Sequence, residues 1–197
     1  QNMNKFSDYR SYTCVILSVP PDPSEESGDI SFTADRIIKE GKKLGINVLF
    51  FDLNTTYIDD NLLICADHPK GVEINEESLF ILARGSITER SSWINLLKQL
   101  EHKHITCINS SECSQTCSDK YQTYLALKEA NVPQPHTNML ISECDPDDYT
   151  FPIILKTTRG SKGIGVLFIE SFKALKSTVQ LLKALDENVE LIVQEFV

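Results

Sequence analysis

The sequence predicts an α/β protein in which a small doubly wound domain is followed by a second, β-β-α-β unit. Two observations support this fold class. Short apolar runs alternate with helix-like stretches from Tyr12 to Ile108, which is the pattern of parallel strands joined by crossover helices. From Phe151 onward, a glycine-bearing loop lies between two apolar runs, and a helix-like run and one more strand-like run follow.

The first predicted strand is the apolar run Tyr12–Val19, which ends in a proline-rich, acidic loop. Ser31 can cap a helix that runs to about Leu44, with Gly45 as its stop. Ile46–Phe51 is the next strand, and the β-α-β order predicts a parallel pair with a right-handed crossover. Neither G-x-G-x-x-G nor GxxxxGK[ST] occurs, so we expect the first strand to be scaffold or to line a substrate cleft.

The sequence of residues 62–83 predicts a hairpin and another strand. Leu62–Cys65 is a short strand, His68–Gly71 resembles a turn, and Val72–Ile74 can complete the hairpin. The strand Leu79–Ala83 places Arg84 at its C-terminal end, where ligands of open α/β sheets bind. Arg84 is therefore a candidate anion contact, and a solvated or ion-paired arginine is the alternative.

Two more helices and two more strands complete the path to the second unit. Ser91 or Ser92 can start a helix, and the strand Ile105–Ile108 follows it. The inward face of that helix is expected to carry Trp93, Ile94, Leu97 and Leu100. Ser118 is the expected cap of a helix over Lys120–Glu129. Asn131-Val-Pro-Gln-Pro135 ends that helix, and Asn138–Ile141 is strand-like.

The second unit is expected to be a β-hairpin followed by a helix and a strand. Its hairpin strands are Ile153–Leu155 and Val166–Ile169. Ser171 can cap a helix whose apolar residues recur at spacings of three and four, namely Phe172, Leu175, Val179 and Leu182. We expect this face to cover the sheet and Leu191–Val193 to pair beside the hairpin.

Composition narrows the class of protein. The chain has 197 residues and a net charge of −9, and an acidic balance argues against general nucleic-acid binding. No apolar run approaches the ~20 residues of a membrane span, and no secretory core is present, so we expect a cytoplasmic protein with six reduced cysteines. One group of residues suggests zinc, but its spacing fits no standard ligand pattern: His102, His104, Cys107, Cys113 and Cys117.

The loop after Ile153–Leu155 carries the functional signal. Lys156, Arg159 and Lys162 give it a charge of +3, and no acidic residue lies between Phe151 and Gly165. Glycines allow backbone N–H groups to approach a ligand, so the simplest cause of this local charge reversal is a bound polyphosphate. Lys156 alternates out of an apolar strand toward the loop, which fits a lysine that reaches a phosphate. The alternative is that the glycines only form a turn and that the cations are solvated.

These motifs, in this order, resemble ATP-grasp enzymes. The loop Lys156–Gly165, the following helix and Leu191–Val197 are similar to a phosphate loop and hinge, and the similarity extends upstream through Cys117–Lys120 and Asn131–Pro133. Within these enzymes the sequence most resembles the RimK-like glutamate ligases, which modify ribosomal protein S6. The resemblance covers the last part of the chain well and the first part only in the order of strands and helices.

The resemblance implies an organisation and a set of nucleotide contacts. A Rossmann-like pre-ATP-grasp domain would span residues 1–112, a connecting helix and linker 113–137, and an incomplete ATP-grasp lid subdomain 138–197. Apolar residues near Ile154 would line an adenine pocket between lid and body. The implied nucleotide-binding residues are Lys120, Lys156, Arg159, Gly160, Ser161, Lys162, Gly163, Gly165, Gln194, Glu195, Phe196 and Val197.

The implied activity is an ADP-forming carboxylate–amine ligation through an acylphosphate, with ATP, Mg²⁺ and an amino-acid or peptide substrate. The family's magnesium ligands would lie beyond Val197, so no catalytic or metal-binding residue is assigned, and we expect a fragment or shortened homologue with weak or no ligase activity. A ligase of the glutathione-synthetase or D-Ala-D-Ala type, or a non-catalytic nucleotide-binding or interaction module, are the alternatives. No membrane or nucleic-acid partner is expected, and a homo-oligomer is left open.

Overall fold

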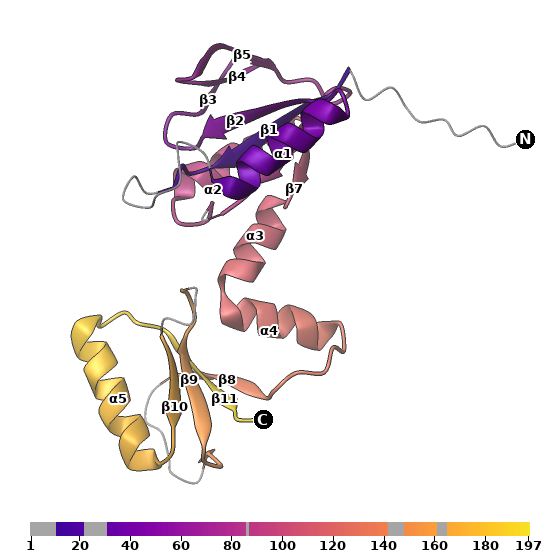
Figure 1. The fold of residues 1–197 in the computed structure, drawn as a ribbon. Helices are drawn as coiled ribbons and strands as arrows, with labels where there is room; N and C mark the ends of the chain where they lie inside the picture. The colour runs from indigo at the N-terminus through magenta and orange to yellow at the C-terminus, as the bar shows by residue number, and fades with distance from the viewer. Residues whose placement is uncertain (1–10, 22–30, 86, 142–147, 161–164) are drawn as a thin grey trace, which may run out of the picture. The chain divides into compact units, whose positions relative to one another are not determined.

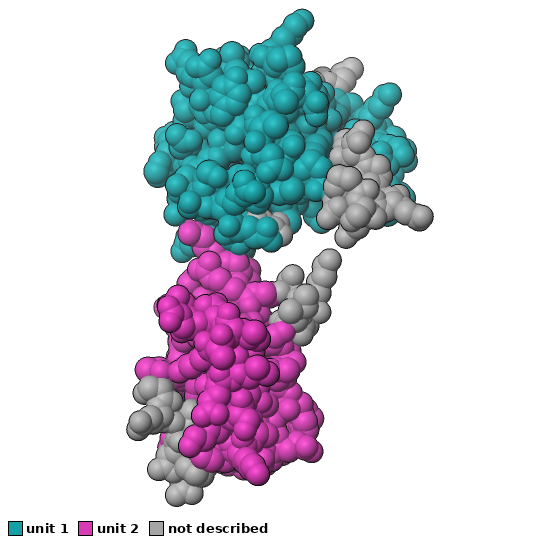
Figure 2. Space-filling view, turned by 90° about the vertical axis from the view of Figure 1, so that its left-hand side faces the viewer, with its two compact units in different colours: residues 1–114 teal, residues 115–197 magenta. Residues whose placement is uncertain are grey.

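A computed structural model of the chain describes residues 11–21, 31–85, 87–141, 148–160 and 165–197. The chain divides into two compact units, residues 1–114 and residues 115–197 (Figure 2). Each hydrophobic core cluster lies within one unit. No helix in the described residues is long and apolar enough to cross a membrane.

Unit 1 is built on a parallel sheet with the strand order β2-β1-β6-β7 (Figure 1). Its strands and its two covering helices are β1 (Thr13–Ser18), α1 (Phe32–Lys43), β2 (Asn47–Asp52), β6 (Leu79–Ala83), α2 (Ser91–His102) and β7 (Thr106–Ile108). All three strand pairs are parallel, as the β-α-β order predicts. The expected doubly wound arrangement is therefore confirmed.

The two faces of this sheet pack against different helices. Alternation along β1 places Val15 and Leu17 in the larger cluster with residues of α2, and Ile16 in a smaller cluster with Ala34 of α1. Four residues of α2 that the sequence assigns to its inward face are buried there: Trp93, Ile94, Leu97 and Leu100. The helix starts are also close to those expected, since the Ser31 hydroxyl accepts the N–H of Ala34 at 3.3 Å and caps α1.

Between β2 and β6 lies a separate antiparallel sheet of three strands, β3 (Tyr57–Asp59), β4 (Leu62–Cys65) and β5 (His68–Glu73). The prediction of a turn over His68–Gly71 is wrong, because these residues begin β5, and β3 was not predicted. Proline and glycine suggested a turn, but Pro69 fits an edge strand, and Gly71 (φ 69°) lies where the register between β4 and β5 shifts.

Helix α3 (Ser111–Ser118) was not predicted. Its first residue, Ser111, is held by Glu101 at the end of α2, whose carboxylate accepts the Ser111 backbone N–H at 2.7 Å and also its hydroxyl. This side-chain cap comes from a residue ten positions earlier, so no local sequence pattern signals it. Helix α4 (Lys120–Glu129) follows after a single residue.

Unit 2 contains α4 and an antiparallel sheet with the order β10-β9-β11-β8. Its remaining elements are β8 (Thr137–Leu140), β9 (Ile153–Thr157), β10 (Val166–Ile169), α5 (Phe172–Leu185) and β11 (Leu191–Glu195). Helix α5 lies along one face of the sheet (Figure 1). Leu155 and Leu175 are fully buried between the helix and this face. The hairpin, the covering helix with its Ser171 cap and the pairing of the last strand with β9 are all as predicted.

Candidate functional site

The face of the unit 2 sheet opposite α5 carries Lys156. Residues of β9 alternate between the two faces, so Ile153 and Leu155 pack under α5, whereas Ile154 and Lys156 lie on the opposite face. Cross-strand register places Val166 of β10 and Ile192 of β11 beside Lys156 on that face. The lysine is thus presented by a rigid central strand rather than by the loop itself.

Lys156 is half-buried, and its ammonium group donates a hydrogen bond to Oε1 of Gln194 at 2.5 Å. The Gln194 amide is fixed in turn, because its Nε2 donates to Thr137 Oγ1 at 2.8 Å, and this hydroxyl donates to the carbonyl of Pro135 at 3.0 Å. Burial, and then the positive charge of Lys120, lower the pKa of Lys156. The charged form of Lys156 is therefore less favourable than that of a fully solvated lysine.

Lys120 reaches the same region from the start of α4. Its backbone N–H donates to the carbonyl of Thr158 at 2.8 Å, and its ammonium group donates to the carbonyl of Gly160 at 3.0 Å. A lysine in the first turn opposes the helix dipole. The fold holds it there through these two contacts with the segment that follows β9, so two lysines far apart in sequence converge on one loop.

The cap of α4 differs from the prediction. Asp119, not Ser118, is the N-cap residue, and its Oδ1 accepts the backbone N–H groups of Tyr121 and Gln122 at 2.9 Å each. Ser118 is the last residue of α3, and its hydroxyl donates to the carbonyl of Gln115. An aspartate accepts two N–H groups here because its carboxylate is the stronger acceptor, and it fixes the direction from which Lys120 enters the site.

The base of the loop depends on Gly165. The Thr157 backbone N–H donates to the Gly165 carbonyl at 3.0 Å and closes the loop. Gly165 has φ +76°, and a Cβ there would lie 2.6 Å from Thr157 Oγ1. That hydroxyl donates to the carbonyl of Arg159 at 2.6 Å. Glycine is thus required at position 165 for two reasons: other residues rarely adopt this positive φ, and a side chain there would collide with Thr157.

An apolar patch adjoins the cations on the same sheet face. The rings of Phe168 on β10 and Phe196 after β11 lie 5.0 Å apart between centroids in an edge-to-face arrangement, and both side chains are about half exposed. Ile154 lies opposite Phe168 in the hairpin register. A surface with apolar walls beside cationic groups suits a ligand that has a flat ring and a charged tail.

The other residues that the sequence predicts to contact the nucleotide differ in their exposure and in their hydrogen bonds. Arg159 and Gly160 are exposed in the loop, and Val197 is exposed after β11, whereas Ser161, Lys162 and Gly163 lie outside the described residues. Glu195 is engaged within the fold, since its carboxylate accepts the His136 backbone N–H at 2.8 Å. Sequence reasoning missed Phe168 and Thr137 as members of the site, although the alternation of Phe168 with Ile169 in the strand was a usable signal.

The described residues offer no cluster of three or more His, Cys, Asp or Glu side chains that could hold a metal ion. Magnesium prefers several oxygen ligands, and Glu195 is already engaged with His136, so the described residues do not fit a magnesium site.

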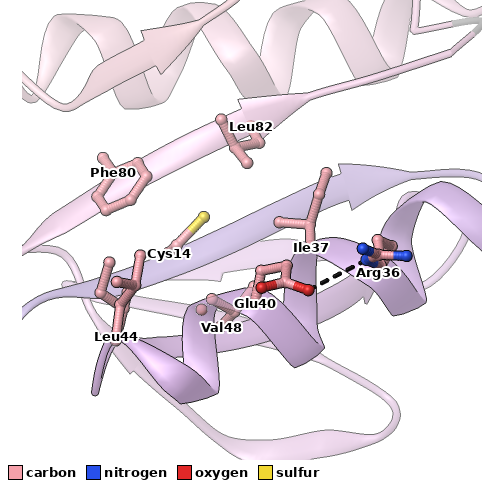
Figure 3. Close-up of a pocket in the computed structure, with 10 residues that line it drawn as sticks. Cys14, Arg36, Ile37, Glu40, Leu44, Val48, Phe80 and Leu82 are labelled. Atoms are coloured by element: carbon pink, nitrogen blue, oxygen red, sulfur yellow. Dashed lines mark hydrogen bonds and ion pairs between the residues drawn. The ribbon is translucent and has the colours of Figure 1, made fainter.

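A pocket in unit 1 lies between α1 and the sheet (Figure 3). Its volume is about 290 Å³, and its walls are mainly apolar, with Leu44, Phe80 and Leu82 among them. Burial raises the pKa of the Cys14 thiol in this pocket to about 12, so the thiol is protonated and unreactive at neutral pH. The two charged residues on its wall, Arg36 and Glu40, pair with each other at 3.1 Å, so the pocket offers a polyphosphate no unpaired cation among its lining residues.

Residues 117–197 match the family model of the ATP-grasp domain. The chain is 28% identical over 121 residues to a probable α-L-glutamate ligase of Haemophilus influenzae, covering 59% of this chain and 39% of that protein. It is 27% identical over 169 residues to a probable α-L-glutamate ligase of Shewanella pealeana, covering 82% of this chain and 36% of the relative. The chain thus spans well under two thirds of these relatives.

Solved structures with the same fold include a RimK domain ATP-grasp protein from Sphaerobacter thermophilus, with a TM-score of 0.64 and 16% identity over 94% of this chain and 64% of that one. A D-alanyl-alanine synthetase A from Vibrio cholerae gives a TM-score of 0.62 with 15% identity, covering 94% of this chain and 59% of that one. These similarities confirm the expected α/β fold of a partial ATP-grasp protein. With the family match and the glutamate-ligase relatives, they show that residues 117–197 are similar to the ATP-grasp domain and that the chain is similar to probable α-L-glutamate ligases over part of their length.

Proposed function

We propose that unit 2 binds ATP, with Lys120 and Lys156 at the phosphates, and that the protein acts as an ADP-forming carboxylate–amine ligase of the RimK-like type. The observation that carries the proposal is the convergence of the two lysines on one loop, where burial and mutual repulsion lower the pKa of Lys156. A polyphosphate would relieve this repulsion, and the fixed positions of both lysines mean that little reorganisation is needed when the anion binds.

The nucleotide base is assigned to the apolar patch formed by Ile154, Phe168 and Phe196. Purine rings bind between apolar walls and take a few hydrogen bonds from backbone groups. Phe196 and Val197 directly follow β11, where the chain leaves the sheet. We therefore assign the base-edge hydrogen bonds to the backbone of residues 195–197 and the ring contacts to Phe168.

In the proposed reaction, a carboxylate attacks the γ-phosphorus of ATP, ADP leaves, and an acylphosphate forms. An amine then attacks the acyl carbon, inorganic phosphate leaves, and an amide results. The contribution of this chain is positioning and charge neutralisation: the lysines hold the phosphates, and the sheet holds the base. The substrates are assigned to the amino-acid or peptide class because the relatives found by sequence are probable glutamate ligases.

Calorimetric titration of the chain with ATP and with ADP tests the nucleotide site. The Lys156→Met variant should bind ATP at least about tenfold more weakly, since it removes a charge-assisted contact with the phosphates. Lys173→Met is a matched control, because Lys173 is exposed on α5, which covers the other face of the sheet. Equal affinity of the Lys156 variant and the control would overturn the assignment.

A second experiment separates a ligase from a nucleotide-binding module. The product of the complete gene is incubated with ATP, glutamate and a peptide acceptor, and ADP release is measured. Release that depends on both glutamate and acceptor supports ligation. Tight ATP binding without acceptor-dependent release would instead assign the protein to the class of non-catalytic modules.

A further inference from the structure

The pocket of unit 1 lies at the amino edge of the parallel sheet. Cys14, Val48 and Phe80 line it, and each is the second residue of its strand, β1, β2 or β6. Leu44, at the C-terminal end of α1, lines it at the same edge. Ligands of open α/β sheets bind at the opposite, carboxyl edge, so this pocket is separate from the usual substrate position of such a sheet.

The sheet face around this pocket is only partly covered. Phe80 and Leu82 of β6 point toward the same space as Cys14 of β1 (Figure 3). Both side chains of β6 are half-buried, and Leu44 is 65% exposed. A parallel sheet normally buries both of its faces. The pocket, about 290 Å³ in volume, is therefore an apolar surface that the described part of unit 1 leaves incompletely covered.

The walls of the pocket favour an apolar occupant. Its two charged residues, Arg36 and Glu40, pair with each other, and Glu40 also accepts the Lys43 ammonium group at 2.9 Å. These charges therefore do not require an ionic partner from the occupant. The volume exceeds the roughly 150 Å³ of an apolar cavity that binds benzene, so one aromatic side chain fits in the pocket.

The chain enters β1 beside this pocket. The Tyr12 carbonyl accepts the Asn47 backbone N–H at 3.3 Å, and the Thr13 backbone N–H donates to the Ser78 carbonyl at 2.8 Å. These two hydrogen bonds hold the chain between the starts of β2 and β6, whose second residues line the pocket. The preceding residues, 1–10, are therefore joined to the sheet at the edge that carries the pocket.

Residues 1–10, which lie outside the described residues, have the length and the composition to fill the pocket. Phe6 precedes Tyr12 by six positions, and an extended chain spans about 3.3 Å per residue, so its reach is about 20 Å. The pocket extends along α1 from Arg36 to Leu44, which is about 12 Å at about 1.5 Å per residue. The reach thus exceeds the length of the pocket. The apolar residues of the segment recur at every third position, with polar residues between them: Met3, Phe6 and Tyr9.

We propose that residues 1–10 form an N-terminal strap that docks between α1 and β6 and places the Phe6 ring in this pocket. In this arrangement Phe6 packs against Leu44 and Leu82, and the strap closes an apolar surface of unit 1 to other molecules. The inference concerns unit 1 alone. It does not rest on the nucleotide site that is proposed for unit 2.

Nuclear Overhauser contacts in the full 197-residue chain test the docking. Contacts are expected between the Phe6 ring and the methyl groups of Ile37, Leu44 and Leu82. Phe6→Ser should shift these methyl resonances because the ring current is lost, whereas the methyl groups of Phe6→Leu should contact the same residues. Phe32→Ser is the matched control, since Phe32 is 79% exposed on the same helix and does not line the pocket, and it should leave the three resonances unchanged.

Indole serves as a probe of access to the pocket. If the strap is docked in about nine of ten molecules, indole should bind Phe6→Ser about tenfold more tightly than wild type. The Phe32→Ser control should bind indole as wild type does. Equal indole affinity of wild type and Phe6→Ser would show that the pocket is open in both and would overturn the inference.

Mixed samples of ¹³C-labelled and unlabelled chains identify the source of the contacts. Contacts between Phe6 and the pocket within one chain support the strap. Contacts that arise only between a labelled and an unlabelled chain would assign the pocket to a second copy and contradict the inference, as would the absence of any Phe6 contact with the pocket in wild type.

Discussion

Lys156 is the residue at which packing and function conflict most clearly. A lysine with a partly buried stem can reach a ligand from a rigid strand, but its charge then loses part of its hydration. The fold offsets this loss with the neutral oxygen of Gln194 rather than with a carboxylate. A neutral partner holds the ammonium group in place without neutralising it, so the positive charge remains available to an anion.

The pKa of Lys156 gives a prediction about pH. Its pKa is lowered in the folded state by burial and by Lys120, so Lys120→Gln should raise the pKa of Lys156 toward its ordinary value. Titration of the lysine Cε resonances by ¹³C NMR measures this change. An unchanged pKa in Lys120→Gln would contradict the proposed interaction of the two charges.

The same pKa sets the direction of two pH dependences. The pKa of Lys156 is lower in the folded state than in the unfolded state. At pH values between the two, the unfolded chain therefore binds more protons than the folded chain. The contribution of Lys156 to the free energy of unfolding should thus increase with pH across that window. Nucleotide affinity should change in the opposite direction, falling as Lys156 loses its proton. Denaturation midpoints and ATP affinities measured across alkaline pH, in wild type and in Lys156→Met, test both signs, and parallel profiles for the two proteins would contradict them.

At the scale of elements, the glycine hairpin and the start of α4 form the site together. The hairpin needs Gly165 at its base, and α4 needs Asp119 at its start, because each fixes the backbone that positions one of the two lysines. Neither residue is proposed to contact the ligand, so substitutions there test the scaffold rather than the chemistry.

Gly165→Ala should destabilise unit 2 by about 1–2 kcal/mol, because alanine is disfavoured at φ +76° and its Cβ would meet Thr157 Oγ1. Urea unfolding followed by amide signals of unit 2 measures the effect. Adding Thr157→Ala to Gly165→Ala removes the steric part of the cost and should recover some stability. A fully stable Gly165→Ala would show that the loop adopts another backbone conformation.

Asp119→Ala should cost about 0.5–2 kcal/mol, since two N–H groups of α4 lose their acceptor. Ser118→Ala is the matched comparison, because its hydroxyl donates to a carbonyl within α3 and does not cap α4. Unfolding free energies should therefore rank the aspartate variant as the less stable one. The reverse order would indicate that Ser118 caps α4, as predicted from the sequence.

At the scale of the whole molecule, the hydrophobic cores are separate. The clusters around Leu17 and Ile16 belong to residues 1–114, and the cluster around Leu155 belongs to residues 115–197. Because stability is carried by buried contacts within each unit, damage to one core should leave local protection in the other intact.

Leu155→Ala tests this separation. The side chain is fully buried in unit 2, so its truncation should cost about 2–5 kcal/mol there. Native-state hydrogen exchange should show faster exchange in β9 and β11 and unchanged protection in β1 and β6. Leu17→Ala is the converse variant in unit 1, and equal loss of protection in both units for either variant would contradict independent cores.

Much of this architecture follows from local sequence. Short continuous apolar runs located β1, β2, β6, β9 and β10, and serine caps located the starts of α1 and α5, because these signals act between residues a few positions apart. Local patterns failed where a distant residue decides the structure. Helix α3 begins at Ser111 because Glu101 binds it, and β5 extends through Pro69 because β4 lies beside it.

The sequence by itself determined that a cationic glycine loop connects two apolar strands and that Lys120 opens a helix, since both are properties of contiguous residues. Only the tertiary structure decided that Lys120 and Lys156 meet at that loop, that Gln194 holds one of them, and that Phe168 and Phe196 share an apolar patch. The physical reason is that strand pairing brings β9, β10 and β11 together from separate parts of the chain, and the resulting register selects which side chains share a face.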